Sequence, residues 1–375
     1  MAAKKKTDDE TGPKLSLKER IKKASKIATA GMLSESRVYE KKDSITTSVP
    51  MINVALSGQV DGGMTPGLLQ ICGKSKHFKS CFSLLIASAF MKKNPDGVVL
   101  FYDSEYGSPK SYFESFDMDA ERVRHAPIKN IEELTFDIVA QLDTFTPDDK
   151  VLVLIDSIGN LASKREIENA LNKNEAQDMT RAKALKSLFR IVTPYLESNG
   201  IPMVVINHVY EAQDNTKKQI VSGGTGVYLS SNNIWIIGRR QDATKTDGAK
   251  EVLGYDFIIN VEKSRNIREG MKIPITVSYT DGIKQWSGLV EEAMDAKWIV
   301  CPKQGWYVKS DPTTGEVLSP KNYRLAEIEN DTEFWKDMFK TTNLAEFIKN
   351  KYTLPSGLMD HVSNTDLDLM ESVDA

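Results

Sequence analysis

The sequence predicts an α/β protein built on a mostly parallel, twisted β-sheet with helices on its faces. Near-continuous apolar runs, which are typical of parallel strands buried on both sides, recur along the first half of the chain. These runs are LLQIC (68–72), VVLFY (98–102), VLVLI (151–155) and MVVI (203–206). Stretches with helical spacing of apolar residues separate them at 80–93, 130–145 and 176–198. This alternation favours right-handed crossovers within one sheet.

The segment that precedes the predicted core is basic, and the end of the chain is acidic. Residues 1–42 hold twelve Lys and Arg against six Asp and Glu, whereas residues 360–375 hold five acidic residues and no Lys or Arg. Apolar residues at helical spacing between Leu15 and Gly31 predict a short basic helix. The pattern indicates an interaction surface at one end and a competitor or regulator at the other, or simply two solvated arms.

The chain beyond residue 230 predicts further elements of both kinds. Short apolar runs at 234–238, 257–261 and 275–279 are expected to be closely spaced strands that extend the sheet. Helical stretches at 287–297 and 332–351 follow, and they predict a small additional domain. We therefore divide the chain into a basic N-terminal helix and oligomerisation segment (1–45), a core (46–285), a small C-terminal domain (286–359) and an acidic tail (360–375).

The composition is that of a soluble globular protein. Apolar residues make up 40% of the 375 residues and charged residues 27%. No apolar run approaches the length of a membrane span, and Met1–Lys6 lacks the apolar stretch of a secretory signal. The three cysteines cannot all pair and have no metal-binding spacing, so we expect a reducing, cytoplasmic setting.

Residues 73–80, GKSKHFKS, differ by one residue from the phosphate-binding pattern G-x-x-x-x-G-K-[ST]. Such a loop points successive backbone N–H groups at phosphates where a helix begins. Phe78 replaces the second glycine, and we expect it to begin the helix with ordinary helical angles and to turn its ring away from the ligand. Lys79 would reach the terminal phosphates and Ser80 would coordinate Mg²⁺. The motif alone also fits a chance match. The predicted nucleotide-binding residues here are Gly73, Lys74, Ser75, Lys76, His77, Phe78, Lys79, Ser80 and Cys81.

Carboxylates follow two of the apolar runs. Asp156 ends VLVLID, where a Mg²⁺-supporting aspartate belongs in a phosphate-loop NTPase. Asp103 and Glu105 end VVLFYDSE, and we expect both to face the crevice at the carboxyl ends of the strands. Glu105 could activate the attacking water. The alternative interpretation is that all three are turn formers or helix caps.

Two long polar segments follow other strands. MVVI ends in Asn207-His208, a pair that could touch the γ-phosphate and signal its presence to residues 209–226, although a lone histidine is more often structural. Residues 209–226 form a segment too long and polar for an ordinary connector, and residues 164–178 are similar. Two such loops on one face of an ATPase favour binding to a polymer, the alternative being two surface insertions.

The order of these parts resembles that of the RecA-type recombinases. The shared parts are the phosphate loop, the D-S-E, I-D-S and N-H strand ends and a second loop that closes in G-G-T-G. The sequence is more similar still to the phage branch, the UvsX-type recombinases. Phe precedes the loop lysine there too, and stretches similar to FYDSE, IDSIGNLASK, DMTRAK, KSLFRIVTPY and VEKSR occur. The resemblance covers roughly residues 45–310 and implies a RecA-like ATPase core.

The resemblance also implies roles for single residues around the nucleotide. Glu105 corresponds to the catalytic carboxylate, and Asp156 stands behind the Mg²⁺ that Ser80 holds. Tyr112 corresponds to the aromatic residue that packs on the adenine. His208 stands where the bacterial family has a glutamine that senses the γ-phosphate.

Two further sets of residues correspond to contacts outside a single subunit. Lys263 and Arg265 match the basic pair that reaches into the ATP of a neighbouring subunit. The polar segments 164–178 and 209–226 match the two loops that hold single-stranded DNA. The residues implied to contact DNA are Lys164, Arg165, Lys173, Arg181, Lys217, Lys218, Gly223 and Gly224.

From this resemblance we expect an ATP- and Mg²⁺-dependent recombination protein that forms helical filaments on single-stranded DNA and catalyses pairing and strand exchange with duplex DNA. The implied partners are a single-stranded DNA-binding protein and a recombination mediator, in the cytoplasm of an infected bacterial host. Two alternatives stay open at this point. One is a nucleotide-regulated mediator without strand exchange, and the other is a helicase built on the same core.

Overall fold

The computed structural model describes residues 15–27, 30–35, 43–172, 180–211, 219–246, 249–318 and 321–354, and its contacts divide the chain into two compact units, 1–42 and 43–375. In the first unit, α1 (Leu17–Ala24) begins at a capping box, in which Ser16 and Glu19 satisfy each other's backbone N–H groups. A short 3₁₀ turn, η1 (Leu33–Glu35), follows. The predicted basic helix is confirmed but ends at Ala24, earlier than the sequence pattern indicates.

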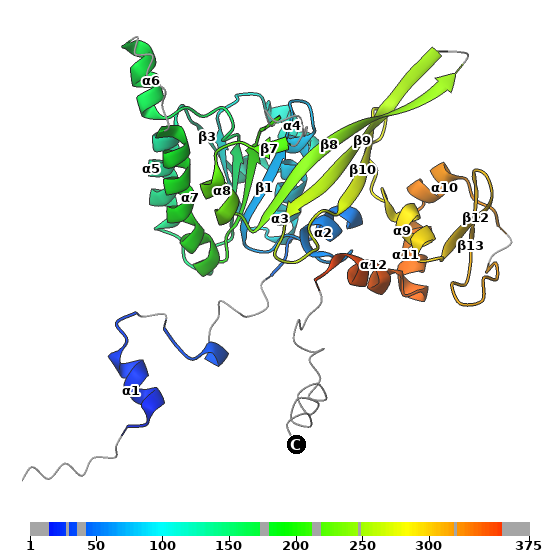
Figure 1. Ribbon diagram of the computed structural model, residues 1–375, viewed down its shortest axis with the longest axis horizontal. Coiled ribbons are helices and arrows are strands. Elements are labelled where there is room, and N and C mark those ends of the chain that lie inside the picture. Colours follow the sequence, from blue (N-terminus) through cyan, green and yellow to red (C-terminus); the bar gives the residue numbers. More distant parts are fainter. Residues whose placement is uncertain are drawn as a thin grey trace, which may run out of the picture. The chain divides into compact units, whose positions relative to one another are not determined.

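Within the described residues of the second unit, nine strands form one sheet in the order β11-β10-β9-β8-β1-β5-β4-β2-β3 (Figure 1). From β8 to β3 in this order, neighbouring strands are parallel, and from β8 to β11 neighbouring strands are antiparallel. The parallel strands are β1 (Gly67–Gly73), β2 (Val98–Asp103), β3 (Val123–Pro127), β4 (Val151–Asp156), β5 (Pro202–Asn207) and β8 (Asn233–Thr246). The predicted mostly parallel sheet is confirmed, although β3 was not predicted because its sequence, VRHAP, is polar and half exposed.

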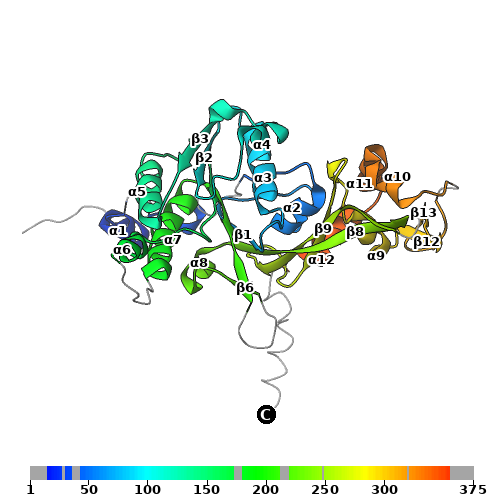
Figure 2. The same cartoon turned by 90° about the horizontal axis from the view of Figure 1, so that it is seen from above.

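Helices cover both faces of the sheet. One face carries α2 (Pro50–Ser57) and α3 (Lys79–Lys93), and the other carries α5 (Ile131–Leu142) and α7 (Thr180–Ser198), as Figure 2 shows. Side chains alternate along β1, so Leu69 enters the core beside α2 and α3 while Leu68 enters the core beside α5 and α7. Burial on both faces explains why the central strands have continuous apolar sequences.

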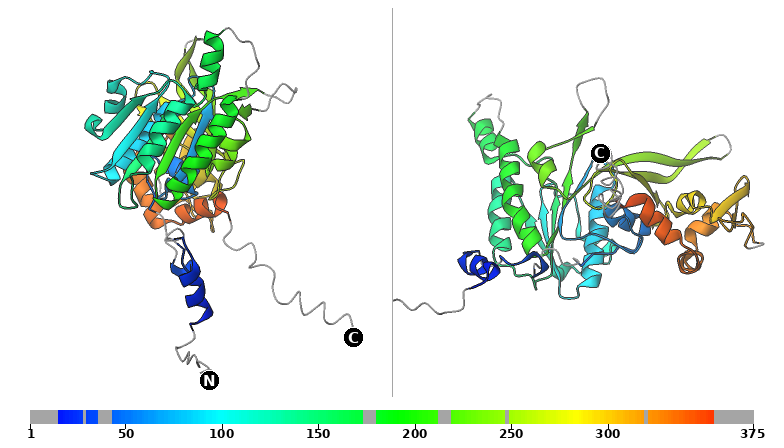
Figure 3. Two further views of the ribbon diagram at one scale, coloured as in Figure 1. Left: turned by 90° about the vertical axis from the view of Figure 1, so that its left-hand side faces the viewer. Right: turned by 60° about the horizontal axis from the view of Figure 1, so that its bottom comes forward.

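The strands predicted at 234–238 and 257–261 are present but longer, and they form a twisted hairpin. β8 pairs with β9 (Ala249–Lys263), which pairs with β10 (Lys272–Ser278) and, through it, with β11 (Gly282–Ile283). Figure 3 shows β8 and β9 extending beyond the helical layers. Of the hairpin side chains, Trp235 is fully buried, and its indole N–H donates to the carbonyl of Ala55 in α2 at 3.2 Å.

The C-terminal part contains short helices around one small hairpin. The elements are α9 (Leu289–Asp295), β12 (Ile299–Lys303), β13 (Trp306–Lys309), α10 (Leu325–Asn330), α11 (Thr332–Thr341) and α12 (Leu344–Tyr352). The single helix predicted at 332–351 is wrong, because the chain breaks at Thr342, whose hydroxyl accepts from the N–H of Leu344 at 3.2 Å. The strands β12 and β13 were not predicted. Trp335 belongs to the same apolar cluster as the α2–α3 face of the sheet.

Short elements occupy the connections between the longer helices and strands. They are α4 (Lys110–Ser115), η3 (Ala120–Arg122), α6 (Lys164–Leu171), β6 (Val209–Glu211), β7 (Gln219–Val221) and α8 (Thr225–Ser230). Among the described residues, no helix has both the length and the apolar character needed to cross a membrane.

Candidate functional site

The predicted phosphate loop joins a fully buried strand to a helix. β1 ends at Gly73, and α3 begins at Lys79. A Cβ atom on Gly73 would lie 3.2 Å from the carbonyl oxygen of Ile237 in β8, so close approach of the neighbouring strand favours glycine there. The ring of His77 is held by the same carbonyl, at 2.6 Å from Nδ1. The strand, turn and helix that a phosphate site requires are therefore present.

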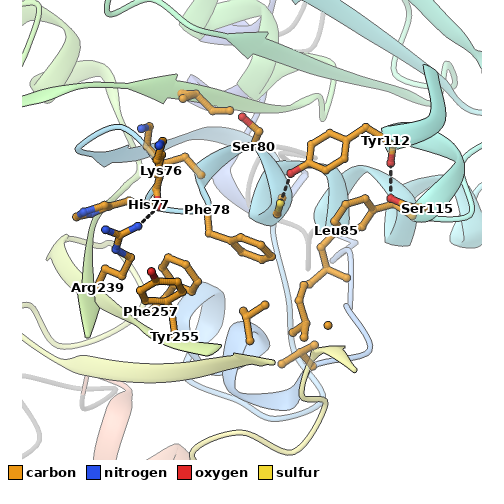
Figure 4. Close-up of a pocket in the computed structure, with 18 of the residues that line it drawn as sticks. Lys76, His77, Phe78, Ser80, Leu85, Tyr112, Ser115, Arg239, Tyr255 and Phe257 are labelled. Atoms are coloured by element: carbon orange, nitrogen blue, oxygen red, sulfur yellow. Dashed lines mark hydrogen bonds between the residues drawn. The ribbon is translucent and has the colours of Figure 1, made fainter. Parts of the chain in front are cut away.

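Phe78 departs from the conformation that we expected. Its backbone is left-handed, with φ 60° and ψ 18°, and not helical. A residue with a Cβ pays about 1–2 kcal/mol for this conformation, which explains why glycine is the usual residue. The ring stacks on Phe257 at 4.9 Å and meets Phe82 edge-on at 5.5 Å. Figure 4 shows the ring directed toward Phe257 and away from Ser80. The predicted helical angles are wrong, and because Phe78 and Phe257 both line the cavity, the predicted direction of the ring away from the ligand stays a prediction.

Lys79, Ser80 and Asp156 converge behind the loop. The Lys79 side chain is buried, and its Nζ donates to the carbonyl of Lys74 at 2.8 Å. Burial lowers the pKa of Lys79, and the charges of Glu105 and Asp156 oppose that shift. The hydroxyl of Ser80 donates to Oδ2 of Asp156 at 2.7 Å.

The second oxygen of Asp156 makes this group suited to a cation. In the described part of the chain, Oδ1 of Asp156 is the one buried side-chain nitrogen or oxygen atom without a hydrogen-bond partner. Burial raises the pKa of Asp156 to about 6. A buried carboxylate oxygen without a partner is costly, and a hydroxyl beside a carboxylate provides the hard oxygen ligands that Mg²⁺ prefers. The donor set fits Mg²⁺ bound with few protein ligands.

Glu105 lies between two hydrogen-bond donors. Its Oε1 accepts from the hydroxyl of Ser157 at 2.6 Å and lies 3.2 Å from Nε2 of His208. The hydrogen bond from His208 is the largest influence, and together with the one from Ser157 it lowers the pKa of Glu105 to about 2 despite partial burial. The carboxylate is therefore ionised at neutral pH. Glu105, Asp156 and His208 all line one cavity with the phosphate loop.

Asp103 has a structural position instead. It is buried, and its Oδ1 accepts from the backbone N–H groups of Glu105 at 3.0 Å and Tyr106 at 2.8 Å. Oδ2 lies 3.2 Å from Nε2 of His125 in β3, a residue that belongs to no sequence motif. The turn-forming interpretation is thus correct for Asp103, which fixes the backbone that carries Glu105.

The cavity beside the phosphate loop has a volume of about 1190 Å³, enough for a nucleotide. Tyr112 lines one side, where its hydroxyl contacts the Cys81 thiol and its ring meets Phe116 edge-on at 5.9 Å. Sequence reasoning missed another wall of the cavity because its residues lie far along the chain, in β8, in β9 or directly after β10. That wall contains Arg239, Tyr255, Phe257 and Tyr279.

The two polar segments start beside the cavity. Gly159 approaches His208 so closely that a Cβ atom would lie 2.0 Å from the imidazole Cδ2. Arg181 binds the same turn, donating to the carbonyl oxygens of Ile158 (2.9 Å), Gly159 (2.7 Å) and Leu161 (2.8 Å). Its guanidinium is therefore engaged within the subunit, and these contacts do not support the predicted role in DNA binding.

The other residues predicted to contact DNA fall into three groups. Lys164 and Arg165 lie exposed in the first turn of α6, which Ser163 caps. Gly223 and Gly224 have φ of 94° and 78°, a conformation that favours glycine, just before α8. The predicted contacts Lys173, Lys217 and Lys218, like the acidic tail 360–375, lie outside the described residues.

Lys263 and Arg265 are not brought to the phosphate loop of their own subunit. Lys263 pairs with Ile234 at the start of β8, whereas Gly73 pairs with Ile237 farther along that strand. Nζ of Lys263 donates to the carbonyl oxygens at the end of α8, at 3.0 and 3.2 Å. Arg265 lies 3.6 Å from the Glu197 carboxylate and is largely exposed. Neither cation lines the cavity.

Comparison with known proteins identifies the family. Over 340 residues, which cover 90% of this chain and 86% of the relative, the chain is 45% identical to the recombination and repair protein of Enterobacteria phage T4. The chain belongs to the UvsX branch of the RecA-type recombinases. Residues 286–348 of this recombinase, which include α9 and α11, also match the C-terminal domain family of the bacteriophage T4 recombination and repair protein. The predicted family and the recombinase role are confirmed.

Proposed function

We propose that this recombinase is a DNA-dependent ATPase that forms filaments on single-stranded DNA and catalyses homologous pairing and strand exchange with duplex DNA. The observation that carries the proposal is the convergence of three groups on one nucleotide-sized cavity: Ser80, the buried Asp156 to which it donates, and the ionised Glu105. A carboxylate that only forms a turn has no need of a place beside a cavity with a second perturbed carboxylate. Perturbed carboxylates in a cleft are typical of catalytic sites.

The residues of the cavity have separable tasks in this proposal. Lys79 and the backbone of the phosphate loop hold the terminal phosphates of ATP, and Tyr112 packs on the adenine. Ser80 and Asp156 hold Mg²⁺, which when bound neutralises charge on the phosphates. Glu105, whose ionised form His208 and Ser157 stabilise, accepts a hydrogen bond from the attacking water and takes its proton.

His208 links the nucleotide to DNA in this proposal. It contacts Glu105 through Nε2 and lies against Gly159, in the turn that precedes the segment 164–178. Its own backbone carbonyl accepts from the N–H of Ser222 at 3.0 Å, at the end of the second polar segment. A γ-phosphate that moves His208 would therefore affect both proposed DNA-binding loops.

The position of Lys263 and Arg265 supports a filament in which neighbouring subunits share an ATP site. Both cations lie away from the cavity of their own subunit, which supports a role at the ATP of a neighbouring subunit in a filament. We extend the proposal to partners of the filament: a single-stranded DNA-binding protein and a recombination mediator, in the cytoplasm of the infected host.

The decisive experiment combines two measurements on the purified recombinase. ATP hydrolysis is measured with and without single-stranded DNA, and exchange of a labelled strand into homologous duplex is followed under the same conditions. We expect stimulated hydrolysis and exchange. Binding to DNA without exchange would support the mediator alternative, and unwinding without homology would support the helicase.

A further inference from the structure

We propose that Lys74 is a positioning residue that couples the phosphate loop to the second DNA-binding loop through its ion pair with Glu211. The inference rests on the proposed function, namely that the cavity binds ATP and that residues 209–226 bind single-stranded DNA. It assigns to the side chain of Lys74 a task other than direct nucleotide binding.

The two ends of Lys74 contact different parts of the molecule. Its backbone carbonyl accepts from Nζ of Lys79, the residue proposed to hold the terminal phosphates, at 2.8 Å. Its own Nζ donates to Oε1 of Glu211 at 2.6 Å, and it is not among the residues that line the cavity. A change in the phosphate loop therefore has a direct connection to Glu211.

Glu211 lies at the outer end of a hairpin whose base is fixed. Strands β6 and β7 pair from Val209–Val221 at the base to Glu211–Gln219, the last pair before the undescribed residues 212–218. Val209 and Val221 pack on an apolar cluster that contains Cys72 of β1 and Ile236 of β8. Because the base is held, the position of Glu211 determines the direction in which the hairpin leaves the body of the protein.

Buried hydrogen bonds attach the same base to β1. Nδ2 of Asn207 donates to the carbonyl of Ser222 at 2.8 Å and to Oε1 of Gln70 at 3.0 Å. Gln70 in turn donates to the hydroxyl of Ser231, at 2.8 Å, at the end of α8. The side chains of Asn207, Gln70 and Ser231 are all buried, so these hydrogen bonds hold the base of the hairpin firmly. The Lys74–Glu211 pair is then the adjustable contact at the other end of the hairpin.

The exposure of the ion pair is consistent with an adjustable contact. The side chains of Lys74 and Glu211 are 50% and 59% exposed, so solvent screens their attraction. An exposed pair of this kind biases an equilibrium by up to about fivefold, which is little for stability of the whole chain. The same bias is sufficient to alter how strongly the bound nucleotide changes the affinity for DNA.

A double-mutant cycle tests the coupling. The variants are Glu211→Gln, Lys74→Met and their combination, and the readout is the ratio of dissociation constants for an oligo-dT strand with ADP and with a slowly hydrolysed ATP analogue. We expect each single variant to reduce this ratio about two- to fivefold at low salt, with the double variant no worse than the stronger single one. At about 0.5 M salt the differences should vanish, because the pair is screened.

The control is Glu333→Gln, which removes an exposed ion pair with Lys336 (2.9 Å) on α11, and it should leave the ratio unchanged. If Glu211 only repelled DNA phosphates, Glu211→Gln would shift both dissociation constants by the same factor and leave their ratio unchanged. An unchanged ratio would therefore overturn the coupling. Additive effects of the two substitutions would also overturn it. A wild-type protein whose DNA affinity does not depend on the nucleotide would contradict the proposed function itself.

Discussion

Phe78 occupies a left-handed backbone position that glycine would adopt without steric cost. Its ring contacts with Phe82 and Phe257 offset that cost, since aromatic pairs of this geometry contribute about 0.5–1.5 kcal/mol each beyond the area they bury. The unusual residue in the phosphate loop is therefore stabilised by side chains from α3 and β9.

Two substitutions of Phe78 separate the backbone strain from the ring contacts. Phe78→Ala removes the ring and keeps the strain, whereas Phe78→Gly removes both. We expect the glycine variant to be more stable than the alanine variant by about 1 kcal/mol, and both to be less stable than the wild type. Urea unfolding measures the order, and an alanine variant as stable as the glycine variant would exclude strain at this position.

Glu105→Gln tests the proposed catalytic carboxylate. The change preserves the shape of the side chain and removes the charge, so nucleotide binding should persist while hydrolysis falls by roughly 10²-fold or more. Filaments should also dissociate more slowly in ATP. Steady-state hydrolysis and nucleotide titration check the two parts, and hydrolysis within a few-fold of the wild type would remove Glu105 from the mechanism.

The influence of His208 on Glu105 predicts a pH effect. In the wild type the pKa of Glu105 is about 2, so its ionised form is fully present above pH 5. His208→Ala removes the largest cause of this lowering, so the pKa of Glu105 should rise, and protonation should reduce activity as the pH falls. Because the ordinary pKa of a glutamate is 4.5, we expect the ratio of variant to wild-type hydrolysis to decrease as the pH falls from about 6 to about 4. A constant ratio would show that His208 does not control the charge of Glu105.

At the scale of elements, Arg181 shows how one side chain fixes the end of a loop. It connects the start of α7 to the turn after β4, and that turn lies against His208. Arg181→Ala would leave three carbonyl oxygens without their donor, which should cost about 1–3 kcal/mol of unfolding free energy in urea titrations.

Arg165→Ala is the matched control for Arg181→Ala, because it removes an exposed arginine at the start of α6. We expect it to change stability by less than about 0.5 kcal/mol and to weaken binding to single-stranded DNA. If Arg181→Ala instead matched Arg165→Ala in both measurements, Arg181 would act as a DNA contact, as the resemblance to the recombinases implies.

At the scale of the whole molecule, the separation of Lys263 and Arg265 from the cavity predicts complementation between subunits. Subunits with Lys263→Ala and Arg265→Ala should bind nucleotide but lack DNA-stimulated hydrolysis. When they are mixed with Lys79→Ala subunits, some interfaces combine an intact phosphate loop with an intact cation pair. Because a trans-acting arginine can contribute on the order of 10³ in rate, even a minority of such interfaces should restore measurable hydrolysis.

Co-assembly on DNA is the control for this experiment, since complementation requires mixed filaments. Fluorescence energy transfer between differently labelled variants would establish it. Mixed filaments without any recovered hydrolysis would place Lys263 and Arg265 outside the catalytic site.

The sequence by itself determined the parallel core strands, the phosphate loop and the chemical types of the site residues. Apolar runs, helical spacing and the order of polar strand ends are local properties, and the parallel arrangement brings those ends to one edge. The sequence pattern did not predict β3 or the β12–β13 hairpin, because these half-exposed strands lack a periodic apolar pattern.

Only the tertiary structure decided what each polar or unusual residue does. Asp103 and Asp156 both end buried strands, yet one is satisfied by backbone N–H groups and the other keeps a buried oxygen without a partner. Phe78 is tolerated because of Phe257, which lies far along the chain. The physical reason is common to these cases: the role of a side chain depends on its burial and its partners, and the fold supplies both from distant segments.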